Sequence, residues 1–260
     1  MKLLTIPFDG AGFGKGRGAR EAPAKIIEQM HDLFLNEAGM SCAYQRIDVP
    51  VNHTNIEETN ENIIRAVSQL KERAIILGGD HSITYACVKA FTKNHPGAGI
   101  VIFDAHPDAE NMFSPPTQED LLIVLVKEGV IAPDRIILLG RRNWTENEMR
   151  FLQEHKIRVY HMRDIQEMGV ETVCDAVMET VRGWPAFYLS IDIDSVDPAY
   201  APGTGYLEPG GLTSREMIYF CQRLKLLKNF GMADITEVNP PLDVRDMTSK
   251  LAAKLVKELS

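Results

Sequence analysis

Two short acidic motifs in the chain each follow an apolar segment typical of a β-strand. The first is Asp104-Ala-His106-Pro-Asp108, and the second is Asp192-Ile-Asp194. Alternate residues of an extended chain point to the same side, so the polar side chains of each motif can project into one cavity. Carboxylates gathered there would repel one another unless a cation lay among them, because buried charges are paired or coordinate metals. The spacing therefore predicts a metal site.

His81 follows a third apolar segment and supplies a sixth candidate ligand. Four carboxylates and two imidazoles without a thiolate favour Mn²⁺, although Fe, Co, Ni or Zn would also fit this set. Six ligands exceed what one catalytic ion with an open position needs. Two ions about 3.5–4 Å apart would use them all and would activate a shared water molecule. We therefore expect two ions per chain.

A single aspartate at the end of a strand is more often a helix cap or a turn residue than a metal ligand. Asp80, and Asp197 before a proline, fit this plainer interpretation. It does not account for an Asp-x-His-x-Asp motif joined by an Asp-x-Asp motif. The histidines that stand in no ligand spacing are expected to be surface or helix residues: His31, His53, His95, His155 and His161.

Apolar segments alternate with segments of helical periodicity. The expected strands are 3–8, 74–77, 99–103, 135–139, 158–160, 186–193 and 232–236. The expected helices are 22–36, 56–69, 83–93, 118–128, 146–154, 170–181, 214–226 and 244–258. This alternation indicates a parallel sheet covered on both faces, with its site beyond the carboxyl ends of the strands. No repeat or linker divides the sequence, so we expect one α/β domain over residues 1–260.

The composition argues against several classes of protein. There are 28 Lys and Arg against 36 Asp and Glu, which gives a net charge of −8 and no basic patch for nucleic acid. The longest purely apolar stretch, residues 121–126, is far shorter than the roughly 20 residues that span a membrane. The first residues do not form a signal peptide, and the four cysteines form no C-x-x-C pair. We expect a cytoplasmic protein without nucleic-acid or membrane partners.

Several motifs, in a specific order, cover most of the chain from Gly10 to Asp243. They are Gly78-Gly-Asp-His-Ser, Asp104-Ala-His-x-Asp, Ser190-x-Asp-x-Asp-x-x-Asp-Pro, residues 201–212 and residues 237–243. Together they resemble the ureohydrolase family of arginases, agmatinases and formimidoylglutamases. The resemblance implies an arginase-like three-layer αβα sandwich with a mainly parallel sheet and a binuclear manganese site. It also implies a homo-oligomer, either a trimer or a hexamer.

The resemblance implies a role for each candidate residue. One ion would be held by His81, Asp104, Asp108 and Asp192. The other would be held by His106, Asp104, Asp192 and Asp194, so that Asp104 and Asp192 bridge the ions. The catalytic residues would be Asp108, which carries a proton to the leaving amine, and Glu237. The Glu237 carboxylate would bind the substrate guanidinium through a charge-assisted pair; the plainer interpretation is a glutamate in a surface loop.

The segment after the first acidic motif departs from the family pattern. Many members carry a histidine there that helps proton transfer, whereas residues 109–120 contain none. Gln118 or Glu119 stands near the corresponding position, and Glu119 is better explained as an acid in the first turn of a helix. The Asn- and Ser-rich pattern with which arginases bind an amino acid is also unmatched, which argues against arginine as the substrate.

The glycine-rich stretch Gly10–Arg20 contains a loose dinucleotide fingerprint and no Walker A sequence. Its glycines do not stand at a strand-to-helix turn, which the nucleotide-binding mechanism requires. We expect a flexible loop over the mouth of the active site, where Arg17 or Arg20 would meet an anionic substrate group.

The sequence supports three hypotheses for function. The leading one is a metal-dependent hydrolase that cleaves a linear C–N bond of a small guanidino compound and releases urea or a similar amide. The second is a related deacetylase-type hydrolase with a single zinc ion, which would not need both His81 and Asp194. The third is a catalytically weak family member that acts as a binding or assembly subunit.

Overall fold

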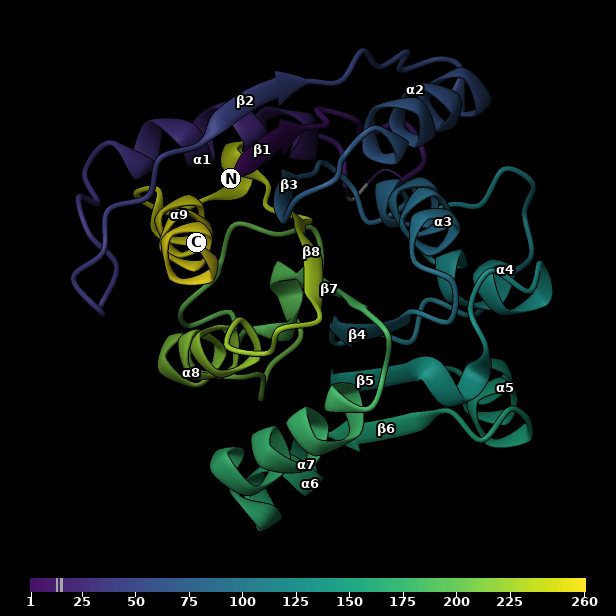
Figure 1. The fold of residues 1–260 in the computed structure, drawn as a ribbon. Helices are drawn as coiled ribbons and strands as arrows, with labels where there is room; N and C mark the ends of the chain where they lie inside the picture. Colours follow the sequence, from purple (N-terminus) through teal and green to yellow (C-terminus); the bar gives the residue numbers. More distant parts are fainter. Residues whose placement is uncertain (13, 15) are drawn as a thin grey trace.

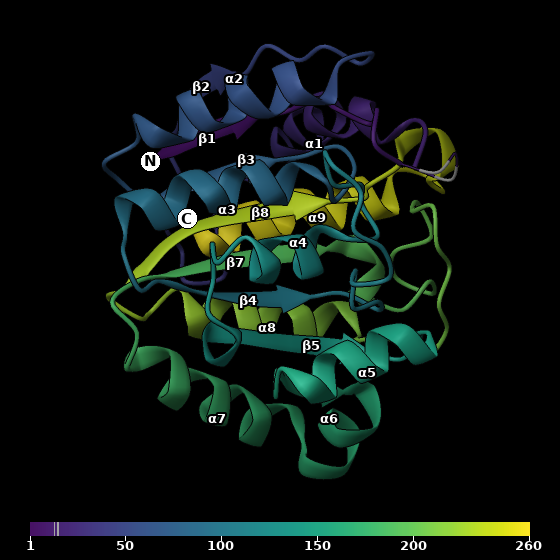
Figure 2. The ribbon, with the colours of Figure 1, turned by 90° about the vertical axis from the view of Figure 1, so that its right-hand side faces the viewer.

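A parallel β-sheet runs through the centre of the computed structural model, and Figures 1 and 2 show it from two sides. The structure describes residues 1–12, 14 and 16–260. Within them, eight strands pair in the order β2-β1-β3-β8-β7-β4-β5-β6, all parallel. The strands are β1 (Lys2–Thr5), β2 (Gln45–Asp48), β3 (Ala74–Leu77), β4 (Gly99–Phe103), β5 (Ile136–Arg141), β6 (Arg158–His161), β7 (Phe187–Asp192) and β8 (Phe230–Thr236).

Helices cover both faces of the sheet (Figure 1). They are α1 (Ala22–Met30), α2 (Ile56–Ser68), α3 (Ile83–Asn94), α4 (Leu121–Lys127), α5 (Glu146–Glu154), α6 (Met162–Met168), α7 (Val170–Arg182), α8 (Ser214–Leu224) and α9 (Met247–Leu259). Side chains alternate between the faces of a strand. Ile75 therefore joins the core under α1 and α6–α9, while Ile76 joins the core under α2–α5. The predicted three-layer αβα sandwich is confirmed.

Two elements are absent from the sequence-based prediction. Strand β2 has the polar sequence Gln-Arg-Ile-Asp and lies largely exposed at an edge of the sheet, so no apolar run marks it. Helix α6 is a seven-residue helix that follows β6 without a loop. Both elements are too short or too polar for a periodic pattern to reveal them.

Four predicted elements also extend beyond the observed ones by three or more residues at one end. Strand β1 ends at residue 5 rather than 8, α1 at 30 rather than 36, and α4 and α9 begin at 121 and 247 rather than 118 and 244. Beyond α1, Phe34 is 82% exposed, so the helical pattern there has no core to contact. Before α4, the Asp120 carboxylate accepts hydrogen bonds from the backbone N–H groups of Phe113 and Thr117 and closes a loop instead of a helical turn.

The four adjacent strands β3, β8, β7 and β4 carry the polar motifs at their carboxyl ends. His81 follows β3, Glu237 follows β8, Asp192 ends β7 and Asp104 follows β4. These segments lie far apart in the sequence, and only the strand order brings them side by side. The site thus lies where a parallel sheet is expected to place it.

Candidate metal centre and active site

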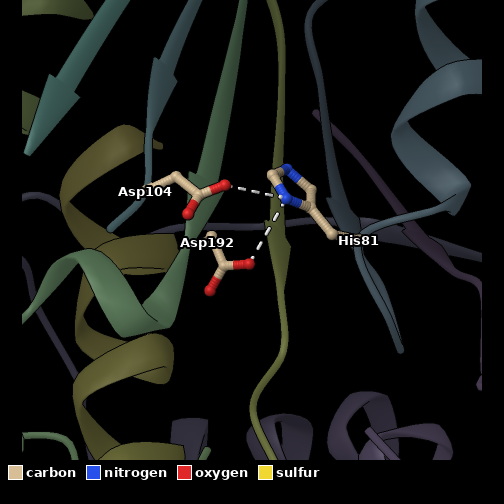
Figure 3. Close-up of side chains that lie close together, drawn as sticks. All are labelled: His81, Asp104 and Asp192. Atoms are coloured by element: carbon tan, nitrogen blue, oxygen red, sulfur yellow. Dashed lines mark ion pairs between the residues drawn. The ribbon is translucent and has the colours of Figure 1, made fainter. Parts of the chain in front are cut away.

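The structure brings the predicted metal ligands together in one buried cluster. Figure 3 shows His81, Asp104 and Asp192 pointing toward one another from the carboxyl ends of three different strands or from the segments that follow them. Two overlapping groups have the geometry to hold a metal ion, and in each the potential ligand atoms lie within 4.8 Å of one another. The first group contains His81, Asp104 and Asp192, and the second contains Asp104, His106 and Asp194.

The first group centres on the Nδ1 atom of His81. This nitrogen lies 2.8 Å from Asp108 Oδ2, 3.2 Å from Asp104 Oδ2 and 3.3 Å from Asp192 Oδ2. The His81 side chain is 1% exposed. Three carboxylates therefore face one imidazole nitrogen away from solvent, as expected for the first ion.

The second group centres on His106. Its Nδ1 atom lies 3.0 Å from Asp194 Oδ2 and 3.6 Å from Asp104 Oδ1. Asp104 thus presents one oxygen to each histidine and belongs to both groups, which fits the expected bridging role. Asp194 is held in place by a hydrogen bond from the backbone N–H of Ala105 to its Oδ1 at 3.0 Å.

The hydrogen bonds of the His81 ring assign the role of one nitrogen. Ser190 Oγ donates its one hydrogen to Asp234 Oδ1 at 2.7 Å, and it lies 3.0 Å from His81 Nε2. Nε2 must therefore be the donor to Ser190. Burial lowers the pKa of His81, but Asp104, Asp108 and Asp192 together outweigh burial and raise that pKa well above its usual range, so a proton stays between Nδ1 and the carboxylates unless a metal ion replaces it. A cation between them suits this arrangement, because metal-bound histidines commonly donate their second N–H to a supporting group.

The carboxylates of the cluster need positive charge. Burial and the charge of Asp104 raise the pKa of Asp108 to about 7. Burial and the charge of Asp194 raise the pKa of Asp192 well above its usual range. Asp104 differs: burial disfavours its charge, but the Arg141 guanidinium together with His106 and His81 outweighs burial and holds the pKa of Asp104 well below its usual range. One arginine does not compensate the whole cluster, so the residues fit divalent cations.

Glu237 lies in the same cluster and is not a surface side chain. It is 4% exposed, and its backbone adopts a left-handed conformation with φ 60°. Its Oε1 accepts a hydrogen bond from the backbone N–H of His81 at 2.7 Å, whereas Oε2 is buried without a hydrogen-bond partner. Burial and the charge of Asp80 raise the pKa of Glu237 well above its usual range. A cation brought to Oε2 would satisfy this carboxylate.

The cluster opens into a cavity of about 270 Å³. Further acids line its walls: Glu110, Glu119, Glu148 and Glu208. Among the described residues, no lysine or arginine lines it. Such a cavity suits a small ligand with positive charge.

Comparison with known proteins places this site in a family. A model described as the Arginase family matches residues 1–260. The chain belongs to the arginase family. It is 31% identical to guanidinopropionase of Pseudomonas aeruginosa, covering 99% of this chain and 84% of the relative. It is 30% identical to formimidoylglutamase of Halalkalibacterium halodurans, covering 98% and 84%. The family resemblance predicted from the sequence is confirmed.

Solved structures agree with this assignment. Formimidoylglutamase from Bacillus subtilis superposes with a TM-score of 0.94 at 26% identity, covering 99% of this chain and 85% of that one. Proclavaminate amidino hydrolase from Streptomyces clavuligerus gives 0.90 at 28% identity, covering 99% and 89%. The names of these arginase-family relatives differ in substrate, so membership of the family does not select one.

In the described part of the chain, no helix has the length and apolar character to span a membrane.

The segment that lacks the family histidine differs from expectation. Glu119 is not an acid of the first helical turn, because α4 begins two residues later. Instead it lines the cavity and accepts a hydrogen bond from the Tyr206 hydroxyl at 2.9 Å. Gln118 is buried, also lines the cavity, and its Nε2 lies 3.5 Å from the same hydroxyl. Both residues therefore belong to the active-site wall of this arginase-family chain.

The glycine-rich loop approaches this wall, although Phe13 and Lys15 lie outside the described residues. A Cβ atom on Gly12 or Gly16 would come within 2.8 or 2.9 Å of the Gln118 side-chain oxygen, so a side chain at either position would have to displace Gln118. This proximity agrees with a loop beside the mouth of the cavity. Arg17 and Arg20 are exposed and do not line the cavity, and Arg20 is 3.9 Å from Asp9 instead.

The plainer interpretation holds for Asp80 and Asp197. Asp80 accepts hydrogen bonds from the backbone N–H groups of Ala11 and Ser82, and Asp197 accepts them from Ala199 and Gly210. Both aspartates therefore organise loops around the site instead of joining the metal cluster.

Sequence reasoning missed part of the wall. Glu208 Oε1 accepts a hydrogen bond from Asn143 at 2.8 Å and lies 3.4 Å from His106 Nε2. Trp144 also lines the cavity. Glu208 lies within residues 201–212, one of the motifs that carry the family resemblance, so the sequence did contain a signal for this residue. Asn143 and Trp144 follow β5 directly, at the sheet end where sites form, but neither has a motif that marks it.

Proposed function

We propose that this arginase-family chain is an amidinohydrolase that cleaves a linear C–N bond of a small guanidino compound and releases urea or a similar amide. The observation that carries the proposal is the buried cluster of two imidazoles and four carboxylates beside Glu237. Membership of the arginase family supports it.

The proposal includes two manganese ions, held by the six residues of the cluster as the resemblance implies. When bound, two such ions supply an activated water molecule at neutral pH. The oxygen-rich ligand set without a thiolate supports Mn²⁺ over softer choices. Asp104, which faces both histidines, would be shared between the ions.

Glu237 would bind and orient the substrate. Its Oε2 is buried, lacks a hydrogen-bond partner and belongs to a residue that lines the cavity. A planar guanidinium donates to a carboxylate through parallel N–H groups, so it would meet this oxygen and favour the ionised form of Glu237. Burial and the charge of Asp104 raise the pKa of Asp108 to about 7. Asp108 could therefore take up and release a proton near neutral pH.

The outer wall of the cavity favours a substrate whose far end is cationic or neutral. Glu119 is hydrogen-bonded to Tyr206, and Glu110 to Thr145, so neutral partners leave their negative charge uncompensated. A carboxylate at the far end of the substrate would be repelled there. Among guanidino compounds, an amine-tailed one such as agmatine is therefore expected to be better than arginine, guanidinobutyrate or formimidoylglutamate.

The deciding experiment measures product release and metal content together. Manganese-loaded protein would be assayed with agmatine, arginine, guanidinobutyrate and formimidoylglutamate while bound manganese is counted. About two ions per chain with hydrolysis of the amine-tailed compound support the proposal. One ion, with zinc preferred, would indicate the deacetylase-type hydrolase. Full loading with no turnover of any of the four would indicate a binding or assembly subunit.

We further propose that the chain works as one domain over residues 1–260 in a cytoplasmic homo-oligomer, a trimer or a hexamer. The family resemblance supports the oligomer. Sedimentation of the purified protein gives its mass, and a monomer at micromolar concentration would contradict this part of the proposal.

A further inference from the structure

A second cavity of about 360 Å³ lies beside the active site, between α5 and the ends of β5 and β6. Its walls are largely apolar and include Met149, Leu152 and Ile157. Trp144 lines both this cavity and the active-site cavity, so one aromatic side chain lies between them. The volume is within the usual range of small-molecule sites, which is roughly 300–1,000 Å³.

The buried charged group in the wall of this cavity is Arg141, the last residue of β5. Its side chain is only 1% exposed. Nη1 donates to the backbone oxygen of Asp104 at 2.6 Å and lies 3.4 Å from Asp104 Oδ1. Nε is buried and has no hydrogen-bond partner among the described residues. A guanidinium has five N–H donors, so Arg141 retains capacity to bind an acceptor.

The charges around this cavity all have one sign. Lys156 adds a second cation at its exposed side, and no aspartate or glutamate is among the described residues that line it. Gln153 supplies a neutral polar group. A buried donor left without an acceptor costs free energy, and an anion with an apolar body would complement both the cations and the walls.

We propose that the cavity bounded by Arg141, Trp144, Met149 and Lys156 binds a small monocarboxylate with an apolar body. The carboxylate accepts charge-assisted hydrogen bonds from the Arg141 guanidinium and pairs with Lys156. The aliphatic or aromatic remainder packs between Trp144 and the apolar face of α5. This site is distinct from the metal cluster and is independent of which substrate the active site cleaves.

Hexanoate is a suitable probe, with hexanamide as the matched neutral control. Binding to the manganese-loaded protein would be followed by calorimetry and by tryptophan fluorescence, to which Trp144 and the buried Trp184 contribute. For a ligand of this size we expect a dissociation constant of about 1 mM, and at least about tenfold weaker binding of hexanamide. Equal affinity for the two probes would overturn the assignment of the carboxylate contact.

Two variants locate the site without removing the buried arginine. Met149→Trp fills the cavity from a position that is 41% exposed, and Lys156→Glu reverses an exposed charge. Each should weaken hexanoate binding about tenfold or more, whereas the exposed, distant Lys71→Glu should leave it unchanged. Hexanoate binding that survives both variants but disappears on metal chelation would show that hexanoate binds the active site instead, and would overturn the proposal. A different result would also overturn the proposal. If the parent protein binds no hexanoate but forms a dimer that Met149→Trp abolishes, the cavity belongs to the contact with a second copy of the chain.

Discussion

Two neighbouring cavities in this molecule have opposite electrostatic character. The active-site cavity is lined by eight aspartates and glutamates, together with two histidines, and among its described residues has no lysine or arginine. The cavity beside it is lined by Arg141 and Lys156 and, in the described part of the chain, has no acid. Trp144 lines both.

The difference shows how each site obtains its counter-charge. Asp104 forms an ion pair with an arginine, because Arg141 Nη1 lies 3.4 Å from its Oδ1. The charge of Arg142 also attracts Asp194 and Asp104. Its neighbours Asp108 and Asp192 have raised pKa values because burial and nearby carboxylates disfavour their charges. The active-site cavity therefore needs cations from solution, whereas the second cavity already holds its cation and needs an anion.

The largest effect is expected from Asp192→Asn. If both ions depend on this carboxylate, the variant should lose most of its bound manganese. Because a divalent ion lowers the pKa of its water by roughly eight units, hydrolysis should fall by more than about 10⁴-fold. Metal analysis and urea release measure the two effects. Asp134→Asn, at an exposed position, is the matched control, and full loading with normal activity in Asp192→Asn would contradict the bridging role.

Glu237→Gln tests whether the acidity serves the substrate as well as the ions. The glutamine can still accept the hydrogen bond from His81 N, so the fold and both ions should be retained. Loss of one partner of a desolvated charge pair costs about 2–5 kcal/mol, which is roughly 30-fold to several thousand-fold in the specificity constant. Steady-state kinetics beside metal analysis decide the outcome: near-normal activity would make Glu237 structural, and lost manganese would make it a support for the ligands.

Ser190→Ala tests the hydrogen bond that orients His81. Removal of a group that supports a metal ligand typically costs about 10–100-fold in metal affinity. The matched control is Thr84→Val. Thr84 Oγ1 also donates to Asp234, at 2.7 Å, but it lies 3.5 Å from Ser190 Oγ and forms no hydrogen bond with the His81 ring. Manganese titration compares the two variants. An equal loss in both would show that Asp234 stabilises the fold and does not act through His81.

Gln118→His restores a titratable group to the segment that lacks the family histidine. Gln118 lines the cavity, so the new imidazole could exchange protons there. Because the position lies against Gly12 and Gly16, the ring has little freedom to reach the best geometry. We expect turnover to be unchanged or raised by less than about tenfold, with manganese content unaltered. Lost manganese would show that Gln118 supports the metal cluster.

The sequence predicts the metal cluster because its ligands stand in two short motifs and at strand ends. Alternation within Asp104-Ala-His106-Pro-Asp108 already implies a shared cavity, and the parallel sheet supplies the common edge. The strand order does not follow from these motifs. Strand β8 lies between β3 and β7 although it is the last strand in the chain, and this position places Glu237 against His81.

The second cavity could not be predicted for a physical reason. Arg141 ends an apolar strand, where a charged residue normally turns to solvent, and no motif distinguishes it from Arg142. Its side chain is buried by tertiary packing, against Asp104 and beside a cavity that residues of α5 also line. Likewise, the exposed edge strand β2 has no apolar pattern, and the role of Glu119 depended on where α4 begins. These features arise from tertiary contacts that local patterns do not encode.

The smallest expected effect connects the two cavities through Arg141. Its positive charge lies beside Asp104 and so opposes a divalent ion there, while a carboxylate bound to Arg141 would neutralise that charge. Saturating hexanoate should therefore tighten manganese binding about fivefold, and manganese should tighten hexanoate binding by the same factor, because coupling between binding sites is reciprocal. Titration of manganese with hexanoate or hexanamide present measures the effect. In Lys156→Glu, at the hexanoate concentration that saturates the parent protein, the effect should become smaller because less hexanoate is bound, while manganese affinity without hexanoate stays normal. An unchanged manganese affinity in the parent protein at saturating hexanoate would show that Arg141 does not couple the cavities.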